Sequence, residues 1–423
     1  MALLRQLRAE ADADAGRSND PKERQMRRRF FEFTGVAAVF LAFVVLLKLA
    51  PVPGAAQVER SSEGVATTSV DTTPWGEPDL QGIWTDVYQT PLQRSPRNAG
   101  KEFLDDAERE ALDQQRSVIE LRPRQERGTE RDVAGAYNSV FMSVKPTGRR
   151  TSMIVDPPDG RIPPTTPELQ KGMAVEREYR LALLQATATC KNQDPGCRGG
   201  KYGPPSPRQR EAPPRYSTGN INRVDNPEDR SMSERCMQAV LPDFGGFRRI
   251  VQSPGSVAIF YDVGQGQGWQ RYIPVTTNPH LPANVRQWFG DSRGRWEGNT
   301  LVVDVTNFSP KSEFMGSREN LHLIERWTRI GPDTLEYAVT IEDPTTWTKP
   351  WTVKQEYTKQ AEQANRIYYE PRCHEGNYGL AALLAGGRTV DQAFAAGRGP
   401  HPAAFDNATG MQAPEEATDP LNR

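Results

Sequence analysis

Residues 321–341, LHLIERWTRIGPDTLEYAVTI, contain two runs of alternating apolar and polar residues on either side of a Gly-Pro-Asp turn. Successive side chains of a β-strand point to opposite faces, so each run predicts a strand with one buried face. The short turn between the runs requires the two strands to pair antiparallel. This stretch therefore predicts a β-hairpin and places the chain in the β class.

Further short strands are predicted on both sides of this hairpin, beginning near Arg248. Residues 253–255 (SPG) and 295–300 (RWEGNT) have the composition of turns that join antiparallel neighbours. The additional predicted strands cover residues 250–251, 257–261, 270–275, 300–305, 351–358 and 366–370. This spacing predicts a mainly β domain, an antiparallel barrel or sandwich, with a lipocalin-like barrel as one form.

The remaining chain divides into segments of different composition. Within residues 75–247, an irregular and helical part, we expect helices at 101–122 and 167–187 and short strands at 80–85 and 151–155. The predicted segments are a cytoplasmic tail (1–29), a transmembrane anchor (30–50), a linker (51–74), the irregular part (75–247), the β domain (248–378) and a C-terminal helix and tail (379–423).

The anchor is predicted from the apolar run 33–47, which follows the basic cluster Arg27-Arg28-Arg29. Basic residues beside an apolar segment stay in the cytoplasm, so the chain after Ala50 is expected in the periplasm, tethered to the inner membrane by a single pass through the bilayer. Residues 30–50 are long enough to cross the hydrocarbon. The alternative is a signal peptide cleaved after the small residues 54–56.

Composition narrows the partners and the compartment. The formal net charge of the 423 residues is −1, which gives no overall field for nucleic acid, so no nucleic-acid partner is predicted. Four cysteines suit an oxidising compartment, and among three possible connectivities we favour Cys190–Cys197 and Cys236–Cys373. No Cys-x-x-Cys spacing signals haem or zinc, so no cofactor and no metal are predicted.

Nine motifs follow one another in the region from about residue 75 to residue 380. They are RTSMIVDPPDGRIPP (150–164), PEDR (227–230), ERC (234–236), HLP (280–282), GDSRGRWEGNTLVVD (290–304), TNF (306–308), ENLHLIER (319–326), EDPTTWTKPW (342–351) and CHEGNY (373–378). In this order they resemble an uncharacterised family of exported bacterial proteins. The resemblance implies a β-rich exported domain and no particular activity.

Two positions depart from what the resemblance implies. Members of that family usually carry a histidine after the strand that matches residues 259–261, where this chain has Asp262, and often one where Arg295 stands. If those histidines serve chemistry elsewhere in the family, this chain lacks them. The departures favour a binding or scaffolding role.

Few residues are candidates for catalysis. Asp291 and Glu297 are candidates for the paired carboxylates of a glycosidase, but acids that pair with Arg293 and Arg295 in a charged turn are the expected alternative. His322, between Leu321 and Leu323 on a predicted strand, is a candidate site residue or a structural histidine. His374 could contribute to a metal site only with ligands from elsewhere, such as His280 or His322.

Aromatic residues are concentrated in the predicted β domain, and most are expected to fill its core. Trp347 and Trp351 flank Lys349 and a proline, a setting that favours a surface anchor for a partner, and Trp269 is a further interface candidate.

These observations predict a non-catalytic, membrane-anchored accessory or scaffold subunit. Its expected partners are the subunits of a larger membrane protein complex, for example a photosynthetic or respiratory one. One alternative is a lipocalin-like binder of a small apolar ligand. Another is a periplasmic hydrolase that uses His322, Asp291 and Glu297.

Overall fold

The computed structural model describes residues 71–120, 145–216, 226–227, 235–236, 241–264, 267–360 and 378–405. The predicted cytoplasmic tail, the predicted anchor at 30–50 and most of the predicted linker lie outside these residues, as do the predicted strand 366–370, Cys373 and His374. Among the described residues, no helix is both long enough and apolar enough to cross a bilayer.

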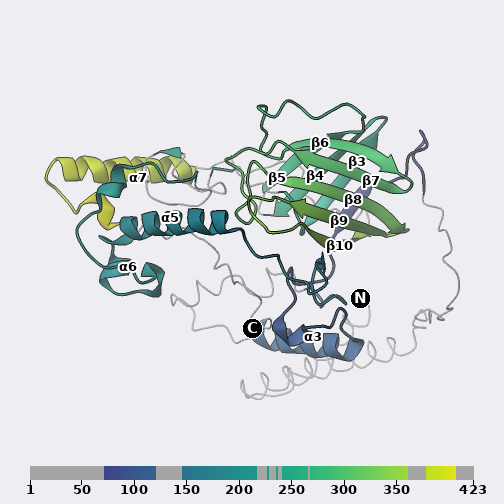
Figure 1. Cartoon of the computed structure of the whole chain (residues 1–423), viewed down its shortest axis with the longest axis horizontal. Coiled ribbons are helices and arrows are strands. Elements are labelled where there is room, and N and C mark those ends of the chain that lie inside the picture. Colours follow the sequence, from purple (N-terminus) through teal and green to yellow (C-terminus); the bar gives the residue numbers. More distant parts are fainter. Residues whose placement is uncertain are drawn as a thin grey trace, which may run out of the picture. The chain divides into compact units, whose positions relative to one another are not determined.

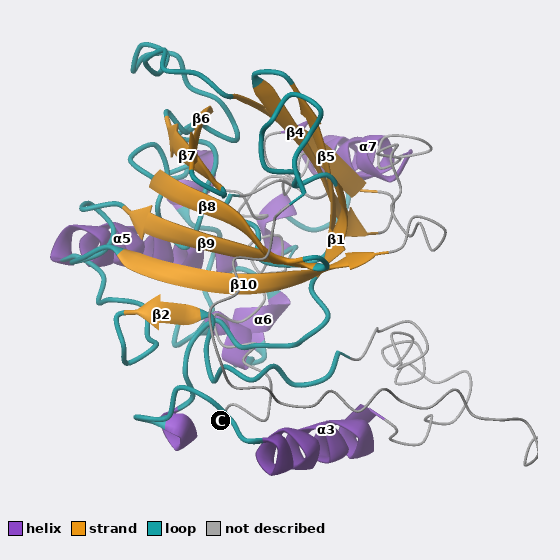
Figure 2. Ribbon diagram, turned by 90° about the vertical axis from the view of Figure 1, so that its right-hand side faces the viewer, coloured by secondary structure: helices purple, strands orange, loops and turns teal. Residues whose placement is uncertain are grey.

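One antiparallel sheet dominates the described chain, which confirms the mainly β class (Figures 1 and 2). The strand order is β5-β4-β3-β1-β10-β9-β8-β7-β6, and β2 pairs with β10 outside this path. The strands are β1 Gly82–Thr85, β2 Ile154–Asp156, β3 Phe247–Ser253, β4 Ser256–Gly264, β5 Gln267–Pro274, β6 Asp291–Glu297, β7 Thr300–Thr306, β8 His322–Gly331, β9 Thr334–Glu342 and β10 Trp351–Gln360.

The hairpins predicted from alternation are confirmed. Strands β8 and β9 pair antiparallel with Trp327 opposite Tyr337, and both rings are buried. Strands β3 and β4 meet at a tight turn in which Ser253 lies opposite Ser256. The alternation fixes the register because a shift by one residue would expose the apolar face.

Strand β6 was not predicted, because its residues were interpreted as a charged turn. It pairs with β7 from Asp291 opposite Thr306 to Glu297 opposite Thr300, and the turn is limited to the two residues between them. The alternation is hidden in the sequence because an inward position is taken by Gly294. A Cβ atom there would lie 3.1 Å from Ile273, so the strand approaches β5 closely at a residue with no side chain.

The predicted boundary at residue 248 does not separate two structural units. Strand β1, from the part predicted to be irregular, lies between β3 and β10 in the middle of the sheet. Strand β2 extends the edge of β10. The described residues on both sides of this boundary belong to one compact unit.

The hydrogen-bonded ladder of the sheet does not close. Its edge strands β5 and β6 nevertheless meet, because Val275 and Gly294 form an isolated parallel bridge and the Thr276 amide donates to the Gly294 carbonyl at 2.9 Å. The side chain of Arg271 on β5 also donates to Ser292 Oγ on β6, at 3.0 Å from Nε and 2.9 Å from Nη2. The Arg271 guanidinium therefore links β5 to β6, which the backbone ladder does not join.

The curled sheet encloses one continuous hydrophobic core. Its largest side chains are fully buried aromatics: Trp84, Trp327, Trp351, Tyr261, Tyr337 and Tyr357. Arg248 is also fully buried, with its guanidinium carbon 4.0 Å from the centre of the Tyr357 ring. This distance places the cation against the ring face, where the quadrupole attracts it.

Helices lie outside the sheet ladder. They are α3 Asp106–Glu120, α5 Pro167–Leu184, α6 Ala188–Lys191 and α7 Tyr378–Ala395, with short 3-10 turns at Pro96–Asn98, Pro195–Cys197, Pro207–Arg210 and Pro402–Ala404. The start of α5 follows from its sequence: Thr166 caps it by accepting from the Leu169 amide, and Pro167 occupies the first turn. The predicted helices 101–122 and 167–187 are thus confirmed with shorter bounds.

Candidate functional site

Two histidines and three carboxylates form a cluster at one end of strands β6 to β9. His280, in the connection between β5 and β6, lies 2.9 Å through Nδ1 from Asp291 Oδ2 and 3.0 Å through Nε2 from Asp304 Oδ1. His322 lies 3.2 Å through Nε2 from the same Asp304 oxygen and 3.1 Å through Nδ1 from Glu342 Oε2. We call these five residues the histidine cluster.

Within the histidine cluster, the surroundings of His322 favour its cationic form. A histidine donates to two carboxylates only when both ring nitrogens carry protons. The hydrogen bond to Asp304 raises the pKa of His322, against a smaller opposing effect of burial, and Glu342 raises it further. The same hydrogen bond lowers the pKa of Asp304. Both groups are therefore stabilised in their charged forms.

The cluster should make stability depend on pH. His322 contributes fully below its ordinary pKa of 6.5, and this contribution is lost as the pH rises through its raised folded-state pKa. Asp304 contributes above its ordinary pKa of 3.8 and loses this as the pH falls through its lowered one. We expect His322→Gln to cost about 0.5–1 kcal/mol of unfolding free energy near pH 5.5, as for a partly exposed pair, and less at pH 8.5.

Chemical denaturation of the wild type and His322→Gln between pH 4 and 9 measures this difference. His401→Gln is the control, because within the described residues His401 caps the Ala403 amide and pairs with no carboxylate. A His322→Gln cost that is the same at every pH would contradict the assignment of a cationic imidazole.

The cluster fastens the β5–β6 connection to the sheet. Asp291 also accepts from the Leu281 amide at 2.9 Å, and the Asn307 side-chain amide donates to the Leu281 carbonyl at 2.8 Å. Across the described residues, no group of three His, Cys, Asp or Glu side chains is placed to hold a metal ion. The hydrogen bonds of His322 to Asp304 and Glu342 are those expected of a structural histidine.

Asp291 and Glu297 are not brought together. They occupy opposite ends of β6, about 20 Å apart at the rise of an extended strand, whereas glycosidase carboxylates lie within about 10 Å. Glu297 instead pairs with Arg326 and Arg295, each at 2.8 Å. The hydrogen bond from Arg326, followed by that from Arg295, lowers the pKa of Glu297, opposite to what a general acid needs. The candidate glycosidase pair is wrong. The expected alternative is confirmed in part, because Asp291 pairs with Arg293 and Glu297 with Arg295, although on a strand rather than in a turn.

The tryptophans predicted for an interface belong to the core. Trp347, Trp351 and Trp269 are 2%, 0% and 7% exposed, whereas Lys349 is exposed. Trp347 packs edge-on against Trp351 at 5.5 Å between ring centroids. The turn after Asp343 directs Trp347 into the core. Trp351 is the first residue of β10 and lies at an inward-facing position. Prolines nearby signalled a loop, but the loop is short enough to return both rings to the core.

The structure confirms the predicted Cys190–Cys197 disulfide, which links α6 to the 3-10 turn Pro195–Cys197. Cys236 is also disulfide-bonded, but Cys373 lies outside the described residues, so the second predicted pairing stays a prediction. His374, the remaining candidate, lies outside them as well.

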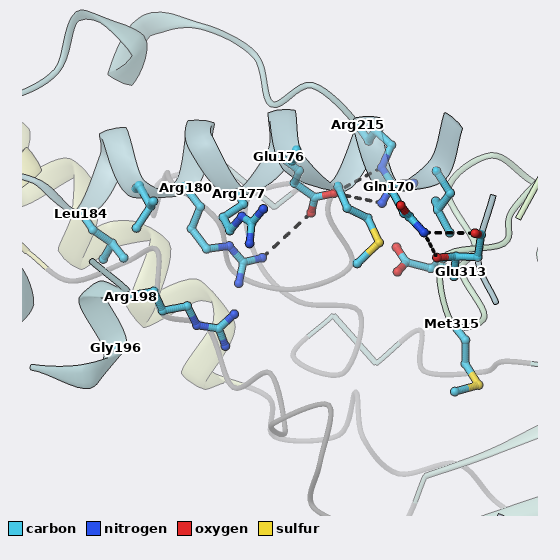
Figure 3. Close-up of a pocket in the computed structure, with 16 residues that line it drawn as sticks. Gln170, Glu176, Arg177, Arg180, Leu184, Gly196, Arg198, Arg215, Glu313 and Met315 are labelled. Atoms are coloured by element: carbon cyan, nitrogen blue, oxygen red, sulfur yellow. Dashed lines mark hydrogen bonds and ion pairs between the residues drawn. The ribbon is translucent and has the colours of Figure 1, made fainter. Parts of the chain in front are cut away.

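A pocket of about 600 Å³ was not predicted from the sequence (Figure 3). Its walls come from α5, from the disulfide-bonded turn and from the loop around Met315. Gly316 of that loop packs on α5, since a Cβ there would lie 3.2 Å from Leu169. Arg177, Arg180 and Arg198 lie at one end, and Glu313 and Met315 at the other (Figure 3). No motif marks this pocket, because its parts are distant in sequence.

No family model matches the chain, and no curated protein matches it. Among solved structures, the chain is similar to a crystal structure of secretory abundant heat soluble protein 4 from Ramazzottius varieornatus. The identity is 15%, over 27% of this chain and 69% of that one, with a TM-score of 0.18. A similarity this low carries no argument about fold or function.

Proposed function

We propose that this protein is a non-catalytic accessory subunit, anchored in the inner membrane through residues 30–50, whose periplasmic β domain binds and stabilises a larger membrane protein complex. The resemblance of residues 75–380 to exported bacterial proteins supports this proposal. The observation that carries it is the surface of α7.

Helix α7 has the composition of a buried helix on a largely exposed surface. Its 18 residues include two charged ones, Arg388 and Asp391, and its buried positions are Leu384 and Gly387. Leu383 is 45% exposed and Phe394 41% exposed. These two residues are three helical turns apart and share a face. A surface helix of a self-sufficient domain normally turns such residues inward, so an apolar face of this kind supports a protein partner.

Mutation of this face tests the proposal. We expect Leu383→Glu combined with Phe394→Glu to abolish copurification of membrane subunits from native membranes in mild detergent, because a carboxylate on a desolvated face is costly. Gln392→Glu is the matched control, since this exposed residue lies on the opposite side of the same helix. Partners retained by the double variant, or lost equally with Gln392→Glu, would contradict the proposal.

A lipocalin-like binder of an apolar ligand is the second candidate, and the contact between β5 and β6 favours it, since a sheet whose edges meet resembles a barrel. The interior counts against it. Trp327 and Tyr337 pack there with ring centroids 4.2 Å apart, and Arg248 occupies the core beside them. Native mass spectrometry that finds a stoichiometric apolar ligand would favour this second candidate.

A further inference from the structure

Among the described residues that line it, the pocket beside α5 has a surplus of positive charge. The described lining includes four arginines and two glutamates: Arg177, Arg180, Arg198, Arg215, Glu176 and Glu313. Both glutamates are engaged by arginines. Glu176 Oε2 accepts from Arg215 at 2.9 Å, and Glu313 pairs with Arg318, which does not line the pocket.

The surplus positive charge lies at the end of the pocket near the Cys190–Cys197 disulfide. Arg177 and Arg198 form no ion pair within the part of the chain that the structure describes, and Arg180 Nη2 is 4.0 Å from Glu176 Oε1. Arg180 has a side chain only 16% exposed. Burial lowers the pKa of Arg180, Glu176 raises it, and Arg198 lowers it by less than Glu176 raises it. An anion placed here would face Arg177 and Arg198, for which the described residues supply no carboxylate partner.

Arg198 is held in place by the local backbone. It follows Cys197 in the left-handed region, with φ at 46°, and its amide donates to the Pro195 carbonyl at 3.0 Å. The Cys190–Cys197 disulfide ties this turn to α6. The held backbone keeps the base of the Arg198 side chain at the pocket wall, within reach of an anion that enters there.

The other walls of the pocket are apolar. Leu169, Leu181 and Leu184 of α5 contribute to them, together with Met173 and Met315. The two methionines are partly exposed, at 39% and 46%. Flexible thioether side chains adapt to irregular apolar ligands. A cationic end and an apolar wall in a pocket of about 600 Å³ match a charged head that carries a hydrocarbon tail.

We propose that this pocket binds an anionic phospholipid, with the phosphate at Arg177, Arg180 and Arg198 and an acyl chain along Leu169, Met173 and Met315. Guanidinium groups recognise phosphate through paired, charge-assisted hydrogen bonds. The proposal does not rest on the accessory role, because it concerns a ligand of this chain alone.

Native mass spectrometry of the full-length protein in a nonionic detergent tests this proposal, with short-chain phosphatidylglycerol as the probe. We expect one bound lipid, and an affinity about tenfold lower for Arg198→Gln, as for loss of one charge-assisted contact. Lys171→Gln is the matched control, an equal charge change on α5 outside the pocket, and should leave the affinity unchanged. Met173→Gln should weaken binding of the lipid but not of inorganic phosphate.

Three results would overturn the proposal. They are equal binding of short-chain phosphatidylcholine, equal binding of inorganic phosphate, and lipid binding that Arg198→Gln leaves intact. Arg198 is exposed on a turn, so its replacement should not impair folding. An unchanged near-ultraviolet circular dichroism spectrum verifies this. The Leu383→Glu and Phe394→Glu variant should bind the lipid normally, which separates failure of this proposal from failure of the accessory role.

Discussion

Replacing Glu325 with leucine should lower the free energy of unfolding by about 3–5 kcal/mol, the typical cost of removing one partner from a buried ion pair. Glu325 is fully buried, and its Oε2 lies 2.6 Å from Arg271 Nη2. Burial alone would lower the pKa of Arg271, but the Glu325 carboxylate raises it above its ordinary value. The substitution would leave a cation in the core without its carboxylate, and would also remove the 2.7 Å hydrogen bond from the Tyr337 hydroxyl.

Urea unfolding followed by near-ultraviolet circular dichroism measures this cost. Glu356→Leu is the matched control, an exposed glutamate on β10, and should change stability by no more than about 0.5 kcal/mol. Replacing Arg271 as well should recover part of the loss, since a buried pair exchanged for apolar residues is often nearly neutral. Equal effects of Glu325→Leu and Glu356→Leu would refute the buried pair.

Trp351→Ala should destabilise the protein by about 3–5 kcal/mol, because the ring is fully buried and its removal leaves a cavity. Trp351 packs against Trp347 and stacks with Phe314 at 6.2 Å. Trp75, which is 37% exposed, provides the control, and Trp75→Ala should cost much less. The same unfolding measurement applies.

This second experiment also separates the core from an interface. A tryptophan that anchored a partner would tolerate alanine in the isolated protein and fail only in binding. If Trp351→Ala left the stability unchanged, the result would favour the predicted interface role of Trp351 and contradict its place in the core.

Much of the sheet could be predicted because apolar residues alternate along its strands. The alternation also held information about the buried charges. Glu325 is in phase with Leu323 and Trp327, and Arg271 is in phase with Trp269 and Ile273. Because charged residues are rarely fully buried, the residue types of Glu325 and Arg271 argue against the inward face that their positions indicate. The pair that joins β5 to β8 was thus detectable from position, although not from residue type.

The candidate sites were harder to predict because they depend on contacts between distant segments. His322 and Asp291 were candidates, but Asp304 and Glu342 were not. The register of the β8–β9 hairpin places Glu342 directly opposite His322, so this contact could have been obtained by counting from the turn. The pocket beside α5 could not, since Arg198, Met173 and Met315 meet only through tertiary packing.

The accessory role is best judged by the mass of the particle that carries this chain. Native mass spectrometry of the tagged wild-type protein, released from its own membranes in mild detergent, should give a mass well above 47.3 kDa, with at least one integral membrane subunit in fixed ratio. A particle of one 47.3 kDa chain, without a stoichiometric protein partner, would contradict the role proposed for it.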